Sequence, residues 1–319
     1  MKVTAIVVTY NRLALLKECI AALLAQDYEN MDILLVDNHS TDGTIEYMNE
    51  LLAENSSKIK ALFLDENTGG AGGFYAGVKA AAYSDADWLW LMDDDTIPER
   101  QACSELVRAV EVIGPENKIG YISSNVYGMQ GECMNTPRMK FMQKGENGYA
   151  DWNCYLEHGL VKVNSATFCA CFVSTDAVRQ VGLPLKEYFL WGDDTEYTLR
   201  LSKYYGQAYL AGKSKVLHKR TGSQSLSIVQ EENPNRMKLY FFYVRNYLIN
   251  LRLYFGVLAP FAKTAHFLLM MLQILLGKSK LKGKKIAVLW KGIFAYWFRR
   301  YDTKMVKNRL DINYVSEKK

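Results

Sequence analysis

About the first hundred residues alternate between short apolar runs and stretches with helical spacing, and this alternation constrains the fold more than any other feature. Four apolar runs predict buried strands: Lys2–Thr9, Asp32–Val36, Ile59–Leu64 and Trp88–Met92. Between the first two runs, leucine and isoleucine recur at helical spacing over Leu13–Leu24. Strands that alternate with helices predict an α/β fold, with a mixed, mostly parallel sheet flanked by helices.

A polar cluster follows each predicted strand at its carboxyl end. The clusters are Thr9–Arg12, Asp37–Ser40, Asn67–Gly73 and Asp93–Asp95. In open α/β sheets, ligands bind at the carboxyl ends of the strands. We therefore expect the four clusters to form one ligand site at a single edge of the sheet.

Asp93, Asp94 and Asp95 directly follow the apolar run Trp88–Met92, with no basic residue between them. Three adjacent like charges repel one another, and a strand end gives them little room to separate. A divalent cation with oxygen ligands would hold them together. A solvated acidic turn is the alternative that their spacing leaves open.

The segment Asn67–Gly73 is rich in glycine and precedes a predicted helix that runs from Phe74 to about Ala82. Glycines let backbone amides approach phosphate oxygens, and a helix N-terminus favours an anion. The pattern matches neither the P-loop nor the dinucleotide-binding motif, which argues against those two classes of protein. A plain turn is the alternative.

Three further positions carry candidate site residues. Asp37 either accepts a hydrogen bond from a base or ribose, or caps the helix that follows. Asp193 and Asp194 precede a predicted helix, Thr195–Tyr204, where carboxylates act either as caps or as a base in a partly enclosed site. His218 follows a predicted strand, and it becomes a candidate Mn²⁺ or Mg²⁺ ligand if the fold brings it to the aspartates.

Cysteine usage and the N-terminus both indicate a cytosolic protein. The six cysteines form no CxxC pair and no framework spacing, which indicates reduced thiols. The N-terminal apolar run turns polar at Thr9, too early for a signal peptide.

Charge divides the chain near residue 235. Residues 236–319 contain 18 Lys and Arg but only 3 acidic residues, a net charge of +15, whereas residues 1–235 carry a net charge of −10. Such a basic region is expected to meet an anionic partner, either a membrane surface or a nucleic acid. We therefore expect one α/β domain over residues 1–235 and a basic, amphipathic helical region over residues 236–319.

The C-terminal region favours a membrane over a nucleic acid, because its basic residues are interleaved with Leu, Met and Trp. Phe261–Leu276 is apolar but interrupted by Lys263, His266 and Gln273, and it is shorter than the about 20 residues of a spanning helix. Apolar helices with basic flanks fit contact with an anionic membrane surface instead. Packing against the α/β domain, or against a second subunit in a homo-oligomer, is the alternative.

Five motifs occur in order along the chain: VVTYNR (Val7–Arg12), VDNHSTDGT (Val36–Thr44), NTGGAGGF (Asn67–Phe74), WLMDDD (Trp90–Asp95) and WGDDTEYTLR (Trp191–Arg200). Together they resemble the inverting glycosyltransferases of family 2, which have a GT-A (Rossmann-like) fold. The resemblance covers about residues 1–220. The third and fourth motifs look most like the bacterial galactofuranosyltransferase and rhamnosyltransferase branch, which builds O-antigens, capsules and mycobacterial galactan.

The resemblance implies a role for each candidate residue. The nucleotide-binding residues would be Thr9, Arg12, Asp37 and Asn67, with the donor loop shaped by Gly69 and Gly70. The metal ligands would be Asp93, Asp95 and His218, and the donor would also be contacted by Asp93 and Asp94. The catalytic base would be Asp194, with Trp191 and Asp193 on the acceptor side. His218 lies 24 residues after Asp194, at the family's spacing, whereas the family more often has Glu at position 193.

These roles predict a metal-dependent enzyme, using Mn²⁺ or Mg²⁺, that transfers a sugar with inversion onto a lipid-linked or growing cell-surface glycan. The expected donor is UDP-galactofuranose, with dTDP-rhamnose as the alternative. The protein would be cytoplasmic and peripheral on the inner face of the cell membrane, with no nucleic-acid partner. A non-catalytic carbohydrate-binding subunit of a polysaccharide assembly complex is the other class left open.

Overall fold

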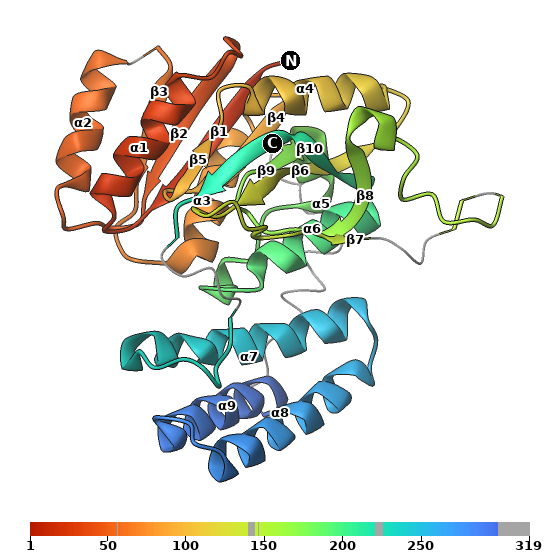
Figure 1. Cartoon of the computed structure of the whole chain (residues 1–319). Coiled ribbons are helices and arrows are strands. Elements are labelled where there is room, and N and C mark those ends of the chain that lie inside the picture. Colours follow the sequence, from red (N-terminus) through yellow and green to blue (C-terminus); the bar gives the residue numbers. More distant parts are fainter. Residues whose placement is uncertain (56, 140–143, 146, 221–225, 299–319) are drawn as a thin grey trace.

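The computed structural model describes residues 1–55, 57–139, 144–145, 147–220 and 226–298. In this part of the chain, one mixed sheet of ten strands forms the centre of an α/β domain, and three long helices form a separate unit beside it (Figure 1). The strand order is β3-β2-β1-β4-β9-β6-β10-β8-β7, and β5 pairs with β10.

The N-terminal half of the sheet is parallel, as the alternating pattern predicts. Its strands are β1 (Val3–Thr9), β2 (Met31–Asp37), β3 (Ile59–Phe63) and β4 (Trp88–Asp93). β1 is buried along its whole length, because it lies between β2 and β4 and is covered on both faces. A parallel strand in this position is apolar throughout, which explains its β-branched sequence.

The second half of the sheet is mixed. The antiparallel strand β9 (Cys171–Ser174) joins β4 to β6 (Ile119–Tyr127), and β6 runs parallel to β10 (Gln207–His218). The remaining strands are β8 (Leu160–Ser165), β7 (Arg138–Met139) and β5 (Thr96–Pro98). The short strand β5 directly follows the aspartates and pairs antiparallel with the end of β10, so it ties the aspartate turn to His218.

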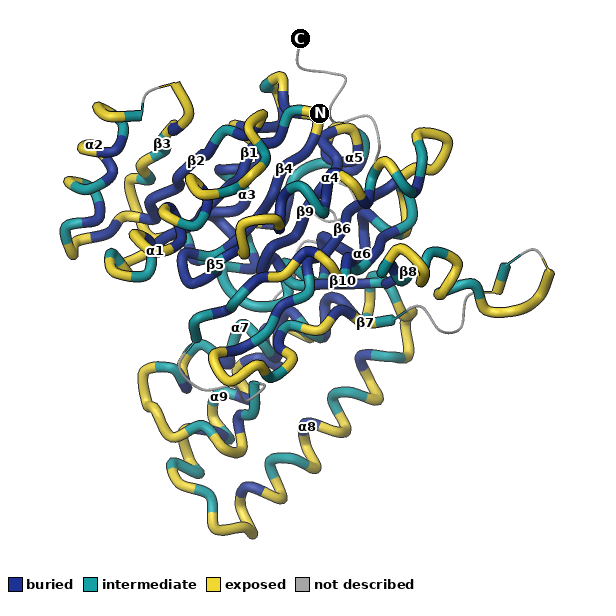
Figure 2. Tube along the Cα trace, turned by 45° about the horizontal axis from the view of Figure 1, so that its top comes forward, coloured by how far each residue is buried: buried dark blue, intermediate teal, exposed yellow. Residues whose placement is uncertain are grey.

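Helices cover both faces of the sheet. One face packs against α1 (Leu13–Leu24), α2 (Thr44–Glu54) and α4 (Ala102–Ile113). The other face packs against α3 (Gly69–Ala81), α5 (Thr175–Val181) and α6 (Asp193–Tyr204). The buried residues of the two resulting cores run through the centre of the domain and hold the strand ends in place (Figure 2).

The C-terminal region forms a three-helix unit below the sheet domain in Figure 1. Its helices are α7 (Pro234–Tyr254), α8 (Ala259–Leu276) and α9 (Lys282–Trp297). The unit has its own apolar core, which includes Tyr240, Val244 and Leu289. α7 also packs against the sheet domain, because Ile249 forms a cluster with Tyr188, which belongs to the short 3₁₀ helix η2 (Lys186–Tyr188).

α8 is the one helix in the described ranges that is long and apolar enough to cross a membrane. It begins at Ala259, two residues before the segment that the sequence marked as too short to span. Only 17% of its 18 residues are buried, and a single helix of this kind is weak evidence for a spanning segment. The unit exposes a series of large apolar side chains: Phe261, Leu268, Leu269, Leu272, Leu275, Leu276, Trp290, Phe294 and Phe298.

The predicted start of α3 is wrong, and the difference has a local cause. α3 begins at Gly69, five residues before its predicted start, since its glycines let the helix pack closely on β1. The next helix, α4, begins only at Ala102, because Thr96–Pro98 pairs with β10 as β5.

Candidate active site

The carboxyl ends of β1, β2 and β4 lie side by side, as parallel pairing requires. Thr9 pairs with Asp37, and Val8 pairs with Asp93. The amide of Asn38 donates to the carbonyl oxygen of Thr9 (2.9 Å), which holds the first two strand ends together. Three of the four predicted polar clusters therefore meet at one edge of the sheet.

A hydrogen-bond network joins the fourth cluster to the others. Asn38, which belongs to the predicted cluster Asp37–Ser40 but had no predicted role of its own, donates through Nδ2 to Oδ1 of Asn67 (3.2 Å) and to the carbonyl oxygen of Gly69 (3.0 Å). The buried carboxylate of Asp37 accepts from the amide of Ser40 (3.0 Å), within the loop before α2, and it does not cap that helix, whose N-cap is Gly43. The predicted contacts of Asp37 and Asn67 with a nucleotide stay predictions.

Thr9 and Arg12 hold two of the three aspartates. The hydroxyl of Thr9 donates to Oδ2 of Asp94 (2.8 Å). Nη1 of Arg12 donates to Oδ1 of Asp94 (3.2 Å) and to Oδ2 of Asp95 (2.8 Å). The cation that the aspartate cluster requires is therefore supplied in part by the chain itself, through a guanidinium group.

His218 reaches the same cluster from β10. Thr96 pairs with His218 across β5 and β10, and the amide of Lys219 donates to the carbonyl oxygen of Asp95 (2.8 Å). As a result, Nε2 of His218 lies 3.2 Å from Oδ1 of Asp95, and both side chains are buried. The fold thus brings His218 to the aspartates, as a metal site would require.

Asn135 orients the imidazole of His218, and no sequence signal marked it. Its Oδ1 lies 2.8 Å from Nδ1 of His218, while its Nδ2 donates to Oγ1 of Thr167 (3.1 Å). This arrangement places a proton on Nδ1, and it turns Nε2 toward Asp95. Asn135 has a φ of 48°, a left-handed conformation that asparagine adopts more readily than most residues.

Burial and mutual repulsion separate the pKa values of the three aspartates. Burial, followed by repulsion from Asp95 and Asp94, raises the pKa of Asp93 to about 7. Burial also raises the pKa of Asp94 to about 6, against the opposing effects of Arg12 and Thr9. For Asp95, burial acts in the same direction, but contacts with His218 and Arg12 outweigh it and lower the pKa. Asp95 is therefore the most fully ionised of the three aspartates at neutral pH.

The surroundings of His218 fit a divalent cation in one respect. Oδ1 of Asp95 is buried, faces Nε2 of His218, and has no hydrogen-bond partner among the described residues. A carboxylate oxygen beside an imidazole whose other nitrogen is hydrogen-bonded is a common pair of metal ligands.

The full set of predicted metal ligands is not assembled, however. Across the described ranges of the chain, no group of three or more His, Cys, Asp or Glu is arranged to hold a metal ion. The predicted set of Asp93, Asp95 and His218 is therefore incomplete in this structure. The guanidinium group of Arg12, which binds Oδ2 of Asp95, provides positive charge at the cluster in this structure.

Gly69 and Gly70 lie in the first turn of α3 and not in a loop before it. Gly69 has a φ of 71°, and a Cβ atom there would lie 2.1 Å from the carbonyl oxygen of Phe189. That carbonyl accepts from the amide of Ala71 (3.1 Å), so one amide at this helix N-terminus already has a protein partner. Position 69 therefore requires glycine for a contact within the protein, and the role of both glycines in donor binding stays a prediction.

Asp193 and Asp194 are the first two residues of α6, which begins two residues earlier than predicted. Oδ1 of Asp194 accepts from the amide of Thr195 (2.6 Å). Burial raises the pKa of both carboxyl groups, and repulsion from Asp194 and, more weakly, from Asp93 raises that of Asp193 further. The effect of Asp93 places the aspartate cluster and the start of α6 within electrostatic range of each other.

Trp191 lies two residues before α6 and is half-buried. Its ring packs edge-on against Tyr240 of α7, with the ring centroids 5.1 Å apart. The C-terminal helices therefore contribute to the surroundings of the predicted acceptor side. Stacking of Trp191 on an acceptor sugar stays a prediction.

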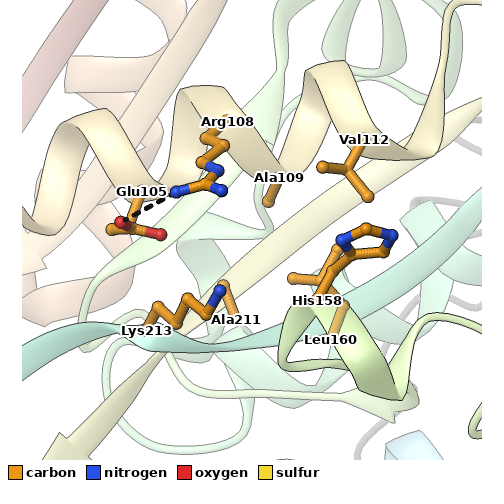
Figure 3. Close-up of a pocket in the computed structure, with 8 residues that line it drawn as sticks. All are labelled: Glu105, Arg108, Ala109, Val112, His158, Leu160, Ala211 and Lys213. Atoms are coloured by element: carbon orange, nitrogen blue, oxygen red, sulfur yellow. Dashed lines mark ion pairs between the residues drawn. The ribbon is translucent and has the colours of Figure 1, made fainter.

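A separate pocket lies between α4 and the strand β10 (Figure 3). Its lining residues are Glu105, Arg108, Ala109 and Val112 of α4, together with His158, Leu160, Ala211 and Lys213. None of the predicted site residues lines this pocket. The candidate active site is therefore the edge formed by the strand ends and the start of α6.

Known proteins resemble this chain in sequence. Residues 4–150 match the family described as Glycosyl transferase family 2. The chain is 36% identical over 199 residues to galactofuranosyltransferase GlfT1 of Mycolicibacterium smegmatis, covering 62% of this chain and 65% of that protein. It is 31% identical over 131 residues to an uncharacterized glycosyltransferase, alr2836, of Nostoc sp., covering 39% of this chain and 38% of that protein. The matched regions thus span less than two thirds of either relative.

Solved structures resemble the chain in fold. Residues 1–349 of TarS from S. aureus, in complex with UDP-GlcNAc, match with a TM-score of 0.55 at 15% identity, covering 96% of this chain and 76% of that one. Mannosyltransferase PcManGT from Pyrobaculum calidifontis, in complex with GDP-Man and Mn²⁺, matches with a TM-score of 0.52 at 15% identity, covering 98% and 74%. The sheet and the match over residues 4–150 together show that the chain carries a glycosyl transferase family 2 domain in a GT-A fold.

Proposed function

We propose that the protein is an inverting glycosyltransferase that moves a sugar from a nucleoside diphosphate onto a hydroxyl group of a glycan. One observation carries the proposal: the fold brings the strand ends that carry the aspartate cluster, Arg12 and His218 beside the start of α6, where Asp193 is buried and Asp194 is half-buried. Cationic groups at one side suit a diphosphate leaving group. A half-buried carboxylate at the other side, that of Asp194, suits deprotonation of an acceptor hydroxyl.

Asp194 is the proposed base. The acceptor oxygen attacks the anomeric carbon while Asp194 takes its proton, and the bond from that carbon to the diphosphate oxygen breaks. The nucleoside diphosphate leaves with the electron pair, and attack from the opposite face inverts the configuration. Burial raises the pKa of Asp194, which makes its carboxylate a stronger base, and the amide of Thr195 fixes its position.

Asp95 and His218 are the proposed holders of a divalent cation, with Asp93 as a third ligand. Such a cation, when bound, neutralises the charge that grows on the departing diphosphate. Arg12, already at the cluster, supplies a further positive charge beside the diphosphate. The manganese complex of the structural neighbour PcManGT supports the choice of Mn²⁺ or Mg²⁺.

The proposed donor is UDP-galactofuranose, with dTDP-rhamnose as the alternative. The galactofuranosyltransferase GlfT1, 36% identical over the aligned region, supports the first choice. The position of His218 beside Asp95 also supports it, because the resemblance to galactofuranosyltransferases implies a histidine metal ligand at this position. The proposed acceptor is a lipid-linked or growing cell-surface glycan.

We place the enzyme in the cytoplasm, on the inner face of the cell membrane. The C-terminal helices expose large apolar side chains, and no acidic residue occurs between Arg236 and Phe298. Exposed apolar groups with basic neighbours favour contact with anionic lipid. This placement also brings the active site near a lipid-linked acceptor.

Product analysis with the purified full-length protein tests the proposal. We expect transfer from UDP-galactofuranose to a synthetic acceptor in the presence of Mn²⁺, with inverted configuration at the new linkage. Asp194→Asn should abolish transfer and leave UDP binding nearly intact, and unchanged turnover would contradict the assignment of the base. Consumption of dTDP-rhamnose alone would overturn the donor. Glycan binding without transfer from either donor would favour a non-catalytic subunit.

A further inference from the structure

Three polar side chains of α7 are buried against the α/β domain. Arg245, Asn246 and Asn250 are 5%, 0% and 6% exposed. Polar groups are buried at a helix surface only where hydrogen bonds compensate for the loss of water. Their partners therefore indicate what the contact between α7 and the domain does.

The partners are the carbonyl oxygens of the turn that leads into α6, residues 187–192. Nη2 of Arg245 donates to Glu187 (2.8 Å) and Tyr188 (3.1 Å). Nδ2 of Asn246 lies 3.0, 3.1 and 2.7 Å from the carbonyl oxygens of Tyr188, Leu190 and Trp191. These contacts join α7 to nearly every peptide unit of the turn.

Asn250 completes the contact at both ends of the turn. Its Nδ2 donates to the carbonyl oxygen of Gly192 (2.8 Å), and its Oδ1 accepts from the hydroxyl of Tyr188 (2.8 Å). Nε of Arg245 donates to Oδ1 of Asn246 (2.9 Å), which fixes which way the Asn246 amide faces. The three side chains therefore act as one unit, which we call the α7 clamp.

The turn needs such support because its backbone is strained. Phe189 has a φ of 63° and a ψ of −58°, and the amide of Leu190 donates to the carbonyl oxygen of Tyr188 (2.7 Å). These values define a γ-turn of the rare, strained type. Trp191 also has a positive φ, 61°, and Gly192 follows with 90°. Phe189 and Trp191, two strained residues so close together, persist only where the surroundings hold them, and such residues cluster at functional sites.

The strained turn connects both sides of the candidate active site. At its end, Gly192 leads directly into Asp193 and Asp194, the first residues of α6. At its centre, the carbonyl oxygen of Phe189 accepts from the amide of Ala71 at the start of α3. A shift of the turn would therefore move the carboxylate of Asp194 relative to the strand ends.

We propose that Arg245, Asn246 and Asn250 are positioning residues for catalysis, which hold the turn 187–192 so that Asp194 meets the acceptor hydroxyl. This inference rests on the proposed function, in which Asp194 is the base. The C-terminal unit is then part of the active site as well as a membrane contact. A small misplacement of a base lowers the rate strongly while leaving binding elsewhere intact.

Asn246→Ala in the full chain tests the proposal, with whichever of UDP-galactofuranose or dTDP-rhamnose the unaltered enzyme consumes. We expect kcat to fall roughly 10- to 100-fold. The Kd for UDP or dTDP should change by less than about threefold, since the strand ends are untouched. Asn246→Asp, which keeps the shape but presents oxygen to the carbonyl groups, should be no better than Asn246→Ala.

Val244→Ala is the matched control. Val244 is fully buried in α7 and packs on α9, with Gly292 beside it, and its side chain makes none of the hydrogen bonds to the turn. This variant should lower the Tm and keep kcat near that of the unaltered enzyme at a temperature where both variants are folded. An equal kcat for Asn246→Ala and Val244→Ala, or a proportional loss of nucleotide binding in Asn246→Ala, would overturn the inference.

Asp194→Asn in the same assay separates this inference from the proposed function. If Asp194→Asn abolishes transfer while Asn246→Ala behaves as the control does, only the role of the α7 clamp is wrong. If Asp194→Asn keeps full turnover, the assignment of the base is wrong. The proposed role of the α7 clamp in positioning that base is then wrong as well.

Discussion

Asp193 and Asp194 are adjacent in the first turn of α6, and burial makes their two charges hard to accommodate together. The charge of Asp194 raises the pKa of Asp193 further, because ionisation of one carboxyl group disfavours ionisation of the other. A general base has to be unprotonated to act. Activity should therefore rise with pH through the raised pKa of the base, and it should be lost as the pH falls below that value.

Asp193→Asn should leave the pKa of Asp194 nearly unchanged, because the pKa of Asp193 is raised further and its carboxyl group is still neutral while Asp194 ionises. We expect the acid limb of the kcat profile to move by less than about half a pH unit. Steady-state rates measured from acid to neutral pH check this, and a shift to lower pH by about one unit would show that Asp193 is charged when Asp194 titrates. Asp176→Asn, the same change in the first turn of α5, should leave the profile in place. If Asp193→Asn abolishes activity while Asp194→Asn does not, the roles of the two aspartates are exchanged.

Asn135→Ala removes the acceptor for Nδ1 of His218, so the imidazole loses the contact that fixes its tautomer. If His218 is a metal ligand, the affinity for Mn²⁺ should fall about 10- to 100-fold, as is typical when a residue behind a metal ligand is removed. Calorimetric titration of Mn²⁺ in the presence of UDP measures the effect. Asn135→Asp keeps an acceptor oxygen and should retain most of the affinity. Equal Mn²⁺ affinity in Asn135→Ala would contradict a role for His218 in metal binding.

At the scale of elements, α6 carries the candidate base at its start and a buried ion pair within its body. Arg200 donates to Glu196 through Nε (3.1 Å) and Nη2 (2.7 Å), and both side chains are 1% exposed. The hydroxyl of Tyr254 on α7 also donates to Glu196 (2.7 Å). The spacing of four residues predicts the pair, whereas its burial and its link to α7 follow from the fold.

Glu196→Ala leaves the guanidinium of Arg200 buried without its partner. We expect a loss of about 3–5 kcal/mol in the free energy of unfolding, the usual cost of breaking a buried pair. Denaturant unfolding followed by circular dichroism measures it. The exposed pair of Lys280 and Glu232 provides the comparison, and Glu232→Ala should cost less than about 1 kcal/mol. Similar losses in the two variants would show that burial does not set the contribution of the Glu196 pair.

At the scale of the whole molecule, the C-terminal unit has two different surfaces, one against the α/β domain and one exposed to the surroundings. Buried polar residues of α7 bind the turn before α6, while α8 and α9 expose apolar side chains. Four lysines, Lys278, Lys280, Lys282 and Lys284, lie in and around the connection between α8 and α9. Apolar side chains with basic neighbours are expected to enter an anionic lipid surface. One unit can therefore bind the membrane and support the active site.

Replacement of these four lysines by glutamine should weaken binding to anionic liposomes by about 1 kcal/mol for each charge. Flotation at increasing lipid concentration measures the change, and the salt dependence of binding should fall with it. Replacing Lys58, Lys60, Lys118 and Lys213, four exposed lysines of the sheet domain, should leave flotation unchanged. Failure of the unaltered protein to float would remove the membrane contact from the proposed function.

The sequence alone determined the α/β class and the edge of the sheet that carries the candidate site. Apolar periodicity sets the type of each element, and parallel pairing places all carboxyl ends together whatever the details of packing. Thr9, Asp37 and Asp93 could therefore be grouped without a structure. His218 could be added only by resemblance, because it follows a later strand whose position in the sheet no local pattern determines.

Only the tertiary structure decided which side chains hold those residues in place. Arg12 binds Asp95 across 83 residues of sequence, Asn135 binds His218 across 83, and Asn246 binds the carbonyl oxygen of Trp191 across 55. A single polar side chain leaves no periodic signal, and its partner is fixed by how separate elements pack. Periodicity reports which face of an element is buried, but it does not report what that face meets. The sequence therefore located the candidate site residues, and the packing of distant segments determined how they are oriented.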